Sequence, residues 1–150
     1  MPDTHRPPDS AVPEGIHHLT FVVRDLDASV RRWSVLLGPP RAFEELPGRN
    51  VRTARFDLGT AHIVLVQPLG AAGEPARVLR EHGEGLLLVS LGVCDLDHAL
   101  EEMERRGVSK EGLERAGLQG WRVQDLPRGF FGGVQFQLCQ SAAGCKKDAE

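Results

Sequence analysis

The stretch that decides the fold is GIHHLTFVVRDLD at residues 15–27, which returns seventy positions later as GLLLVSLGVCDLD at residues 85–97. The first glycine, one valine and the Asp-Leu-Asp triplet coincide without a gap. A repeat of this kind within 150 residues indicates one supersecondary unit used twice, with each copy covering the apolar face of the other. The copies differ where His18 in the first aligns with Leu88 in the second.

Each copy opens a unit of one strand, one helix and three further strands. In the first unit, apolar periodicity and the cap residue Asp25 predict a strand at 16–23, a helix ending at 38–40, and strands at 42–46, 51–58 and 62–67. In the second unit they predict a strand at 86–93, a helix from Asp95 to 106–107, and strands near 107–115, 120–126 and 134–140. The predicted fold class is α+β, with two βαβββ modules forming a cupped eight-stranded mixed sheet and helices outside.

The chain length predicts one domain. Residues 15–140 form it, with module one at 15–67, a connector with a short helix at 68–84, and module two at 85–140. A disordered N-terminal tail at 1–14 and a C-terminal tail at 141–150 flank this domain.

Composition narrows the class of protein. The apolar fraction of 41% and charged fraction of 26% are ordinary for a soluble globular chain. A net charge of −3 without a basic stripe disfavours nucleic acid as a partner, and no apolar run suits a membrane span. Three cysteines without metal-site spacing predict no disulfide framework. We therefore expect a cytoplasmic protein.

Strand alternation assigns the two faces of the sheet. In the strand at 86–93, the aliphatic set expected to lie under a helix is Leu87, Val89, Leu91 and Val93. The cup side of the same strand is predicted to hold Leu86, Leu88, Ser90 and Gly92. The same alternation places His18, Thr20, Thr53, Arg55 and Gln137 on the cup side, where a ligand is expected to bind.

These residues resemble the vicinal oxygen chelate (glyoxalase/bleomycin-resistance) superfamily, and most closely its methylmalonyl-CoA epimerases. The likeness rests on four segments in order: IHHL leading into VRDLD at 16–27, LGT leading into VLVQPLG at 58–70, GEGL at 83–86 and GGVQFQL at 132–138. The resemblance implies paired βαβββ modules around a cup that holds a divalent metal.

The sequence departs from the family pattern at the positions of the metal ligands. The four ligand positions implied by the resemblance fall on His18, Val64, Leu88 and Gln137. Valine and leucine offer no lone pair, so we expect no metal and no other cofactor. A site rebuilt from His18 and His62 would stay incomplete. The carboxylate base of the family falls near Thr53, and Gln137 cannot accept a proton, which disfavours two-base epimerisation.

Three residues are the candidate catalytic groups. His18 is expected to move a proton, while Arg55 and Gln137 hold a substrate oxygen. The structural alternatives are a histidine hydrogen-bonded to Gln137 or to water, and an arginine paired with Asp57 or Asp125. His17 is expected to face the helix layer or a subunit contact.

A further set of residues is expected to bind the ligand. It comprises Thr20, Thr53, Val64, Leu88, Ser90, Trp121, Phe130 and Phe131. The adjacent Phe130 and Phe131 lie between glycines and suggest a hydrophobic lid, or else a contact in a homodimer.

The function that follows is a metal-independent isomerase, cyclase or lyase of specialised metabolism, acting on a hydrophobic acyl or polyketide-like molecule. The alternative is a non-catalytic binder similar to the drug-sequestering resistance proteins of the superfamily, although six Phe, two Trp and no Tyr give it few aromatic groups. A metal-dependent epimerase is the third hypothesis, and the missing donors disfavour it.

Overall fold

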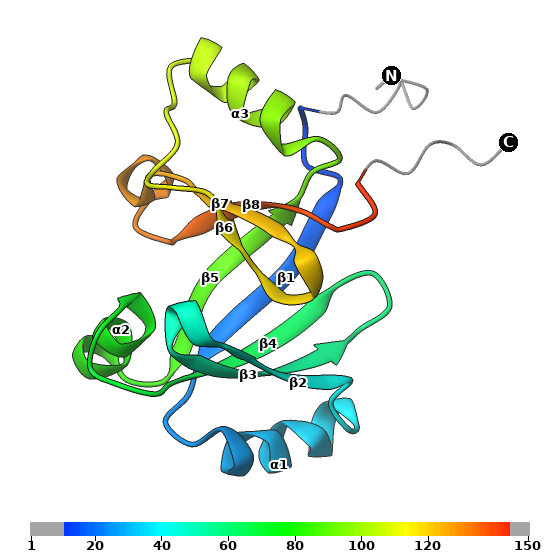
Figure 1. Cartoon of the computed structure of the whole chain (residues 1–150), viewed down its shortest axis with the longest axis vertical. Coiled ribbons are helices and arrows are strands. Elements are labelled where there is room, and N and C mark those ends of the chain that lie inside the picture. The colour runs from blue at the N-terminus through cyan, green and yellow to red at the C-terminus, as the bar shows by residue number, and fades with distance from the viewer. Residues whose placement is uncertain (1–10, 145–150) are drawn as a thin grey trace, which may run out of the picture.

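The computed structural model describes residues 11–144 (Figure 1). The first module contains β1 (Gly15–Val22), α1 (Leu26–Leu37), β2 (Ala42–Leu46), the 3-10 turn η1 (Pro47–Arg49), β3 (Val51–Asp57) and β4 (His62–Pro68). The helix α2 (Glu74–His82) connects the modules. The second module contains β5 (Gly85–Gly92), α3 (Leu96–Arg105), β6 (Arg115–Ala116), η2 (Leu118–Gly120), β7 (Arg122–Asp125), η3 (Arg128–Phe131) and β8 (Phe136–Gln140).

The eight strands form one sheet in the order β2-β3-β4-β1-β5-β8-β7-β6. The antiparallel pair β1 and β5 stands at its centre, and each of these strands has a parallel neighbour, β4 or β8. The two halves of the order therefore mirror each other, with equivalent strands at equal distances from the centre. The predicted α+β architecture of two βαβββ modules is confirmed.

The helices α1 and α3 lie at opposite ends of the sheet, outside the strands (Figure 1). Each begins at the predicted aspartate, because the carboxylate of Asp25 accepts from the Ala28 amide and that of Asp95 accepts from the His98 amide. In each helix, the side chain of a glutamine from a neighbouring strand accepts a hydrogen bond from the first helical amide. These bonds run at 2.8 Å from Leu26 to Gln67 and from Leu96 to Gln140.

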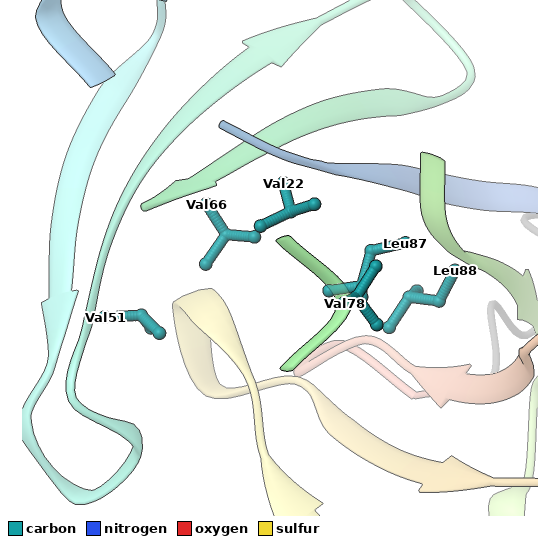
Figure 2. Packing of buried hydrophobic residues seen from close by; sticks show 6 residues of the cluster. All are labelled: Val22, Val51, Val66, Val78, Leu87 and Leu88. Carbon is teal, nitrogen blue, oxygen red and sulfur yellow. The ribbon is translucent and has the colours of Figure 1, made fainter. Parts of the chain in front are cut away.

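The inner face of the sheet carries its own apolar cluster. Val22, Val51, Val66, Val78, Leu87 and Leu88 gather there from β1, β3, β4, α2 and β5 (Figure 2). On the outer face of the sheet, the two modules form separate apolar clusters. Phe56 and Leu65 pack against α1, and Leu138 and Val93 pack against α3. The cup is thus lined by side chains that pack against neither α1 nor α3, and α2 contributes Val78 to it.

One face assignment is wrong at β5. The pairing of β1 with β5 shifts between Thr20 and Phe21, which places Leu87 opposite no residue of β1. Leu87 therefore turns into the inner cluster, which also contains Val78 of α2, and Leu86 becomes 46% exposed instead of lining the cup.

Some predicted boundaries also change. The strand expected near 107–115 is reduced to β6 at Arg115–Ala116. Cys139 is a free buried thiol and Cys94 is disulfide-bonded, so the expectation drawn from cysteine spacing did not hold for Cys94. The tails predicted at 1–14 and 141–150 lie mostly outside the described residues. Between residues 11 and 144, no helix combines the length and apolar character needed to cross a bilayer.

Candidate active site

A narrow cavity of about 40 Å³ lies inside the cup between the two modules, within a concave space of about 470 Å³ that is open to solvent. Its apolar lining consists of Leu46, Val51, Val64, Val66, Pro75, Leu87, Leu88, Leu118, Trp121 and Val123. Its polar side chains are His18, Thr20, Arg49, Thr53 and Gln137. A mostly apolar hollow with a few convergent polar groups has the character of a small-molecule site.

His18 stands in a cluster of aromatic rings at one wall of the cavity. Its imidazole stacks on Trp121, with ring centroids 4.8 Å apart and planes 23° apart. The Nδ1 atoms of His17 and His18 are 2.9 Å apart, so one ring donates a hydrogen bond to the other. The rings of His17 and His62 also contact Trp121. The buried His18 ring is therefore held in one orientation.

The position of His17 is a correction to the sequence analysis. The pairing of β1 with β5 shifts between Ile16 and His18, which leaves His17 as an extra residue in β1. A bulge of this kind interrupts strict alternation, so His17 joins the ring cluster beside His18 instead of facing the helix layer.

Burial keeps both imidazoles neutral. The pKa of His18 is lowered from 6.5 to about 3, mainly by loss of hydration and then by the nearby charges of His17, His62 and Arg49. The pKa of His17 falls to about 4, for which burial is the main cause and His62 the second. At neutral pH each ring therefore has one N–H donor and one bare nitrogen acceptor.

Gln137 lines the cavity and has an unused buried acceptor. Its side chain is only 2% exposed, and its amide nitrogen donates to the Asp125 carboxylate at 3.3 Å. Arg115 donates to the same carboxylate oxygen at 2.8 Å. The amide oxygen of Gln137 is buried and has no partner in the structure. A buried acceptor without a donor costs free energy, which a ligand hydroxyl or amide would recover.

The structure brings together five of the eight residues predicted to bind a ligand. Those that line the cavity are Thr20, Thr53, Val64, Leu88 and Trp121. The Thr53 hydroxyl is already used, because it donates to the Glu44 carbonyl at 2.8 Å. Ser90 lies on the expected face but is fully buried behind the lining.

Phe130 and Phe131 do not cover the cavity. Phe131 packs with Phe136 in the core beside α3, with ring centroids 5.5 Å apart. Phe130 is 64% exposed and lines a separate outer cleft. The two rings still contact each other edge to face, with centroids 4.9 Å apart. The predicted lid is thus not formed in this structure.

Arg55 is the one candidate catalytic residue that does not line the cavity. It belongs to the inner face of β3, as expected, but its Nε donates to Asp57 at 2.9 Å. Asp57 also bonds to the His62 Nδ1 at 2.6 Å. Neither Arg55 nor His62 lines the cavity. The structure thus shows the ion-pair alternative for Arg55, and its guanidinium is occupied.

The charged residue that does reach the cavity is Arg49, which sequence reasoning missed. It is the last residue of η1, in the loop between β2 and β3. No strand alternation applies to a 3-10 turn, so the pattern that placed Arg55 gave no signal for Arg49. Asn50 follows Arg49 and has a φ of 52°. Asparagine tolerates this left-handed conformation, which is typical of a turn.

Comparison with known proteins supports the architecture. Residues 17–124 match the Glyoxalase/Bleomycin resistance protein/Dioxygenase superfamily. The chain belongs to this superfamily. No curated protein sequence matches it.

Solved structures of methylmalonyl-CoA epimerases are similar to this superfamily member over nearly their whole length. The enzyme from Mycobacterium tuberculosis is 25% identical, covers 92% of this chain and 94% of its own, and has a TM-score of 0.84. A variant of the Streptomyces coelicolor enzyme in complex with 2-nitronate-propionyl-CoA is also 25% identical. It covers 91% of this chain and 100% of its own, with a TM-score of 0.84.

The donors at the cavity do not fit the divalent metal implied by the family resemblance. His18, Val64, Leu88 and Gln137, the four positions implied, all line the same cavity. Only one imidazole and one neutral amide among them can bind a cation, and a catalytic zinc site uses three protein ligands. We therefore derive no chemical step through a metal.

A second group of donors lies beside that wall. Ligand atoms of His17, His18 and Cys139 lie within 4.8 Å of one another. The two imidazoles are hydrogen-bonded to each other, and burial raises the pKa of the Cys139 thiol to about 12. The thiol therefore keeps its proton at neutral pH while no cation is bound.

Proposed function

We propose that the protein is a metal-independent member of its superfamily that acts on an apolar acyl or polyketide-like small molecule. The reaction class is isomerisation, cyclisation or lyase chemistry within specialised metabolism. The observation that carries the proposal is the apolar cavity between the modules, in which His18, Thr20 and Gln137 are buried polar groups able to exchange hydrogen bonds with a ligand. Activity in the cytoplasm as a homodimer is part of the same proposal.

His18 is the proton carrier in this mechanism. Its neutral ring presents either a bare nitrogen or an N–H group to the ligand, and its bond to His17 selects the tautomer. An anionic ligand or intermediate beside the ring favours the protonated form and so raises the low pKa of His18 towards the working pH. Gln137 accepts a hydrogen bond from a ligand hydroxyl or amide through its free oxygen.

Arg55 has no part in the reaction proposed here. Its guanidinium is bonded to Asp57 outside the cavity lining. Positioning of the substrate by the apolar walls supplies much of the rate in its place, since orientation alone contributes about 7–11 kcal/mol in favourable cases.

The test is product formation in the presence of a metal chelator. The full chain is incubated with a panel of 2-substituted and unsaturated acyl thioesters in D2O with EDTA, and products are detected by mass. We expect a new product or deuterium incorporation, and His18→Ala should reduce its rate by about 10²–10⁴-fold. His82→Ala, which removes an exposed histidine on α2, is the matched control. Unchanged turnover in His18→Ala, or turnover only with added metal, would contradict the proposal.

A purely binding role is the second candidate. It is favoured by the low pKa of His18, because a base that weak is poorly matched to neutral pH in the free protein. The same panel separates the two functions. A binder shifts its melting temperature with a ligand but yields no new mass, whereas an enzyme yields both. A metal-dependent epimerase would instead require added metal for deuterium exchange beside the thioester carbonyl.

A further inference from the structure

We propose that Arg49 is an anion-binding residue, which holds the carboxylate of an apolar acid whose hydrocarbon part enters the cavity. The inference deepens the proposed function, because it names the substrate class of the same site. It begins from a second hollow, an outer cleft lined by residues of β6, β7, η3 and the start of α2. Four residues line both the cavity and this cleft: Arg49, Pro75, Leu87 and Leu88. Arg49 is the one charged member of the four and so stands at the boundary between them.

The other two arginines of the outer cleft are already paired. Arg115 donates to Asp125 at 2.8 Å, and Arg128 lies 3.3 Å from Glu74. Arg49 has no ion pair or side-chain hydrogen bond with any residue between 11 and 144. Its half-buried guanidinium therefore has all of its donors free for a ligand.

The surroundings of Arg49 favour an incoming negative charge. Burial lowers the pKa of Arg49, the positive charge of Arg115 lowers it further, and Asp125 offsets only part of this effect. A guanidinium keeps its proton at physiological pH even so. A partly desolvated cation next to a second cation is unfavourable, and an anion between them removes the penalty. The Nε of Arg115 is also buried without a partner and offers one more donor.

The backbone holds Arg49 in place before any ligand arrives. The amide of Asn50 donates to the Pro47 carbonyl at 3.3 Å, which closes the η1 turn. The Leu69 amide donates to the Asn50 carbonyl at 2.9 Å and ties the turn to the end of β4. A guanidinium on a fixed turn gives a bidentate contact with a carboxylate at a small entropic cost.

Gln137 places a second requirement on the ligand. The free amide oxygen of Gln137 is an acceptor and would repel a carboxylate, so it suits a hydroxyl or amide group elsewhere on the molecule. The substrate class that fits both groups is an apolar carboxylic acid with its anion at Arg49 and a hydrogen-bond donor deeper in the cavity.

The experiment compares three probes of equal chain length: octanoate, octan-1-ol and octylamine. The reporter is the fluorescence of Trp121 in a Trp33→Phe background, which leaves one tryptophan, in the cavity wall. We expect octanoate to bind most tightly and octylamine most weakly. Arg49→Gln should weaken octanoate by about tenfold or more and leave octan-1-ol unchanged. Arg55→Gln, which removes the same charge outside the cavity, is the matched control.

The outcomes separate this inference from the proposed function. If octan-1-ol binds but Arg49→Gln and Arg55→Gln affect octanoate equally, the inference is wrong and the apolar cavity stands. If no probe changes Trp121 emission, both fail. Should Arg49→Gln not fold, titrations of the Trp33→Phe chain in low and high salt decide the matter. Salt should weaken octanoate binding but not octan-1-ol binding, and an equal response would overturn the inference.

Discussion

The two modules are built alike on their outer sides and differently inside the cup. Outside, both helices start with an aspartate cap and a strand glutamine that bonds the next amide. Inside, strand register makes Val64 and Gln137 equivalent, because Val64 lies opposite Thr20 and Gln137 lies opposite Ser90.

At the four central positions of the cup, the polar side chains of the two modules therefore lie at non-equivalent places. Module one supplies His18 and Val64, and module two supplies Leu88 and Gln137. Each module contributes one polar and one apolar side chain, and the equivalent position across the centre carries the opposite kind. The outer contacts are therefore present in both modules, because each module needs them to fold. Each polar group in the centre of the cup is needed in one module only.

The largest effect should come from restoring the missing donors. Val64→Glu combined with Leu88→His would place a carboxylate and a second imidazole beside His18, which completes three protein ligands. We expect this double variant to bind about one equivalent of Co²⁺ or Zn²⁺ after dialysis, measured by elemental analysis, and the unaltered chain to bind none. Leu86→His, on the exposed part of β5, is the control. Stoichiometric metal in the unaltered chain would contradict the metal-independent hypothesis.

The next largest effect tests whether the contacts under α1 and α3 stabilise the two modules equally. Leu26 and Leu96 occupy matching positions of the repeat, and both are fully buried. Each leucine-to-alanine change should lower the free energy of unfolding by about 2–5 kcal/mol, because it leaves a cavity under α1 or α3. Urea denaturation measures both. A loss at one site more than about twice that at the other would show that the modules are stabilised differently.

The smallest effect concerns the pH dependence of stability. The unfolded chain protonates His18 near pH 6.5, whereas the folded chain does so only near pH 3. The unfolded state therefore binds more protons as pH falls below 6.5, and the free energy of unfolding decreases. Between pH 6.5 and 5 this amounts to about 2 kcal/mol, since each pH unit is worth about 1.4 kcal/mol.

A variant that keeps a ring but cannot titrate isolates this contribution. His18→Phe conserves most of the volume beside Trp121, so it should fold and lose about 2 kcal/mol less than the unaltered chain over that pH range. His82→Gln removes an exposed histidine and should keep the original slope. Equal slopes in His18→Phe and the unaltered chain would show that His18 is not the buried titrating group.

Much of the fold was predictable because its signals are local. The repeat, the Asp25 and Asp95 caps and the alternation of strands identified both modules and placed His18 and Gln137 on one face. The predictions were wrong where a bulge or a turn interrupts the local pattern. Bulges in the central strand pair moved His17 and Leu87, and the η1 turn carried Arg49 into the cavity in place of Arg55.

The sequence alone determined that one unit is used twice and that two of its four central side chains have no donor atoms. These are properties of covalent structure and of periodicity, which no packing can alter. Only the tertiary structure decided which guanidinium faces the cavity and which atoms remain without partners. Those outcomes depend on where bulges and turns point side chains, and on which charges meet across segments distant in the chain.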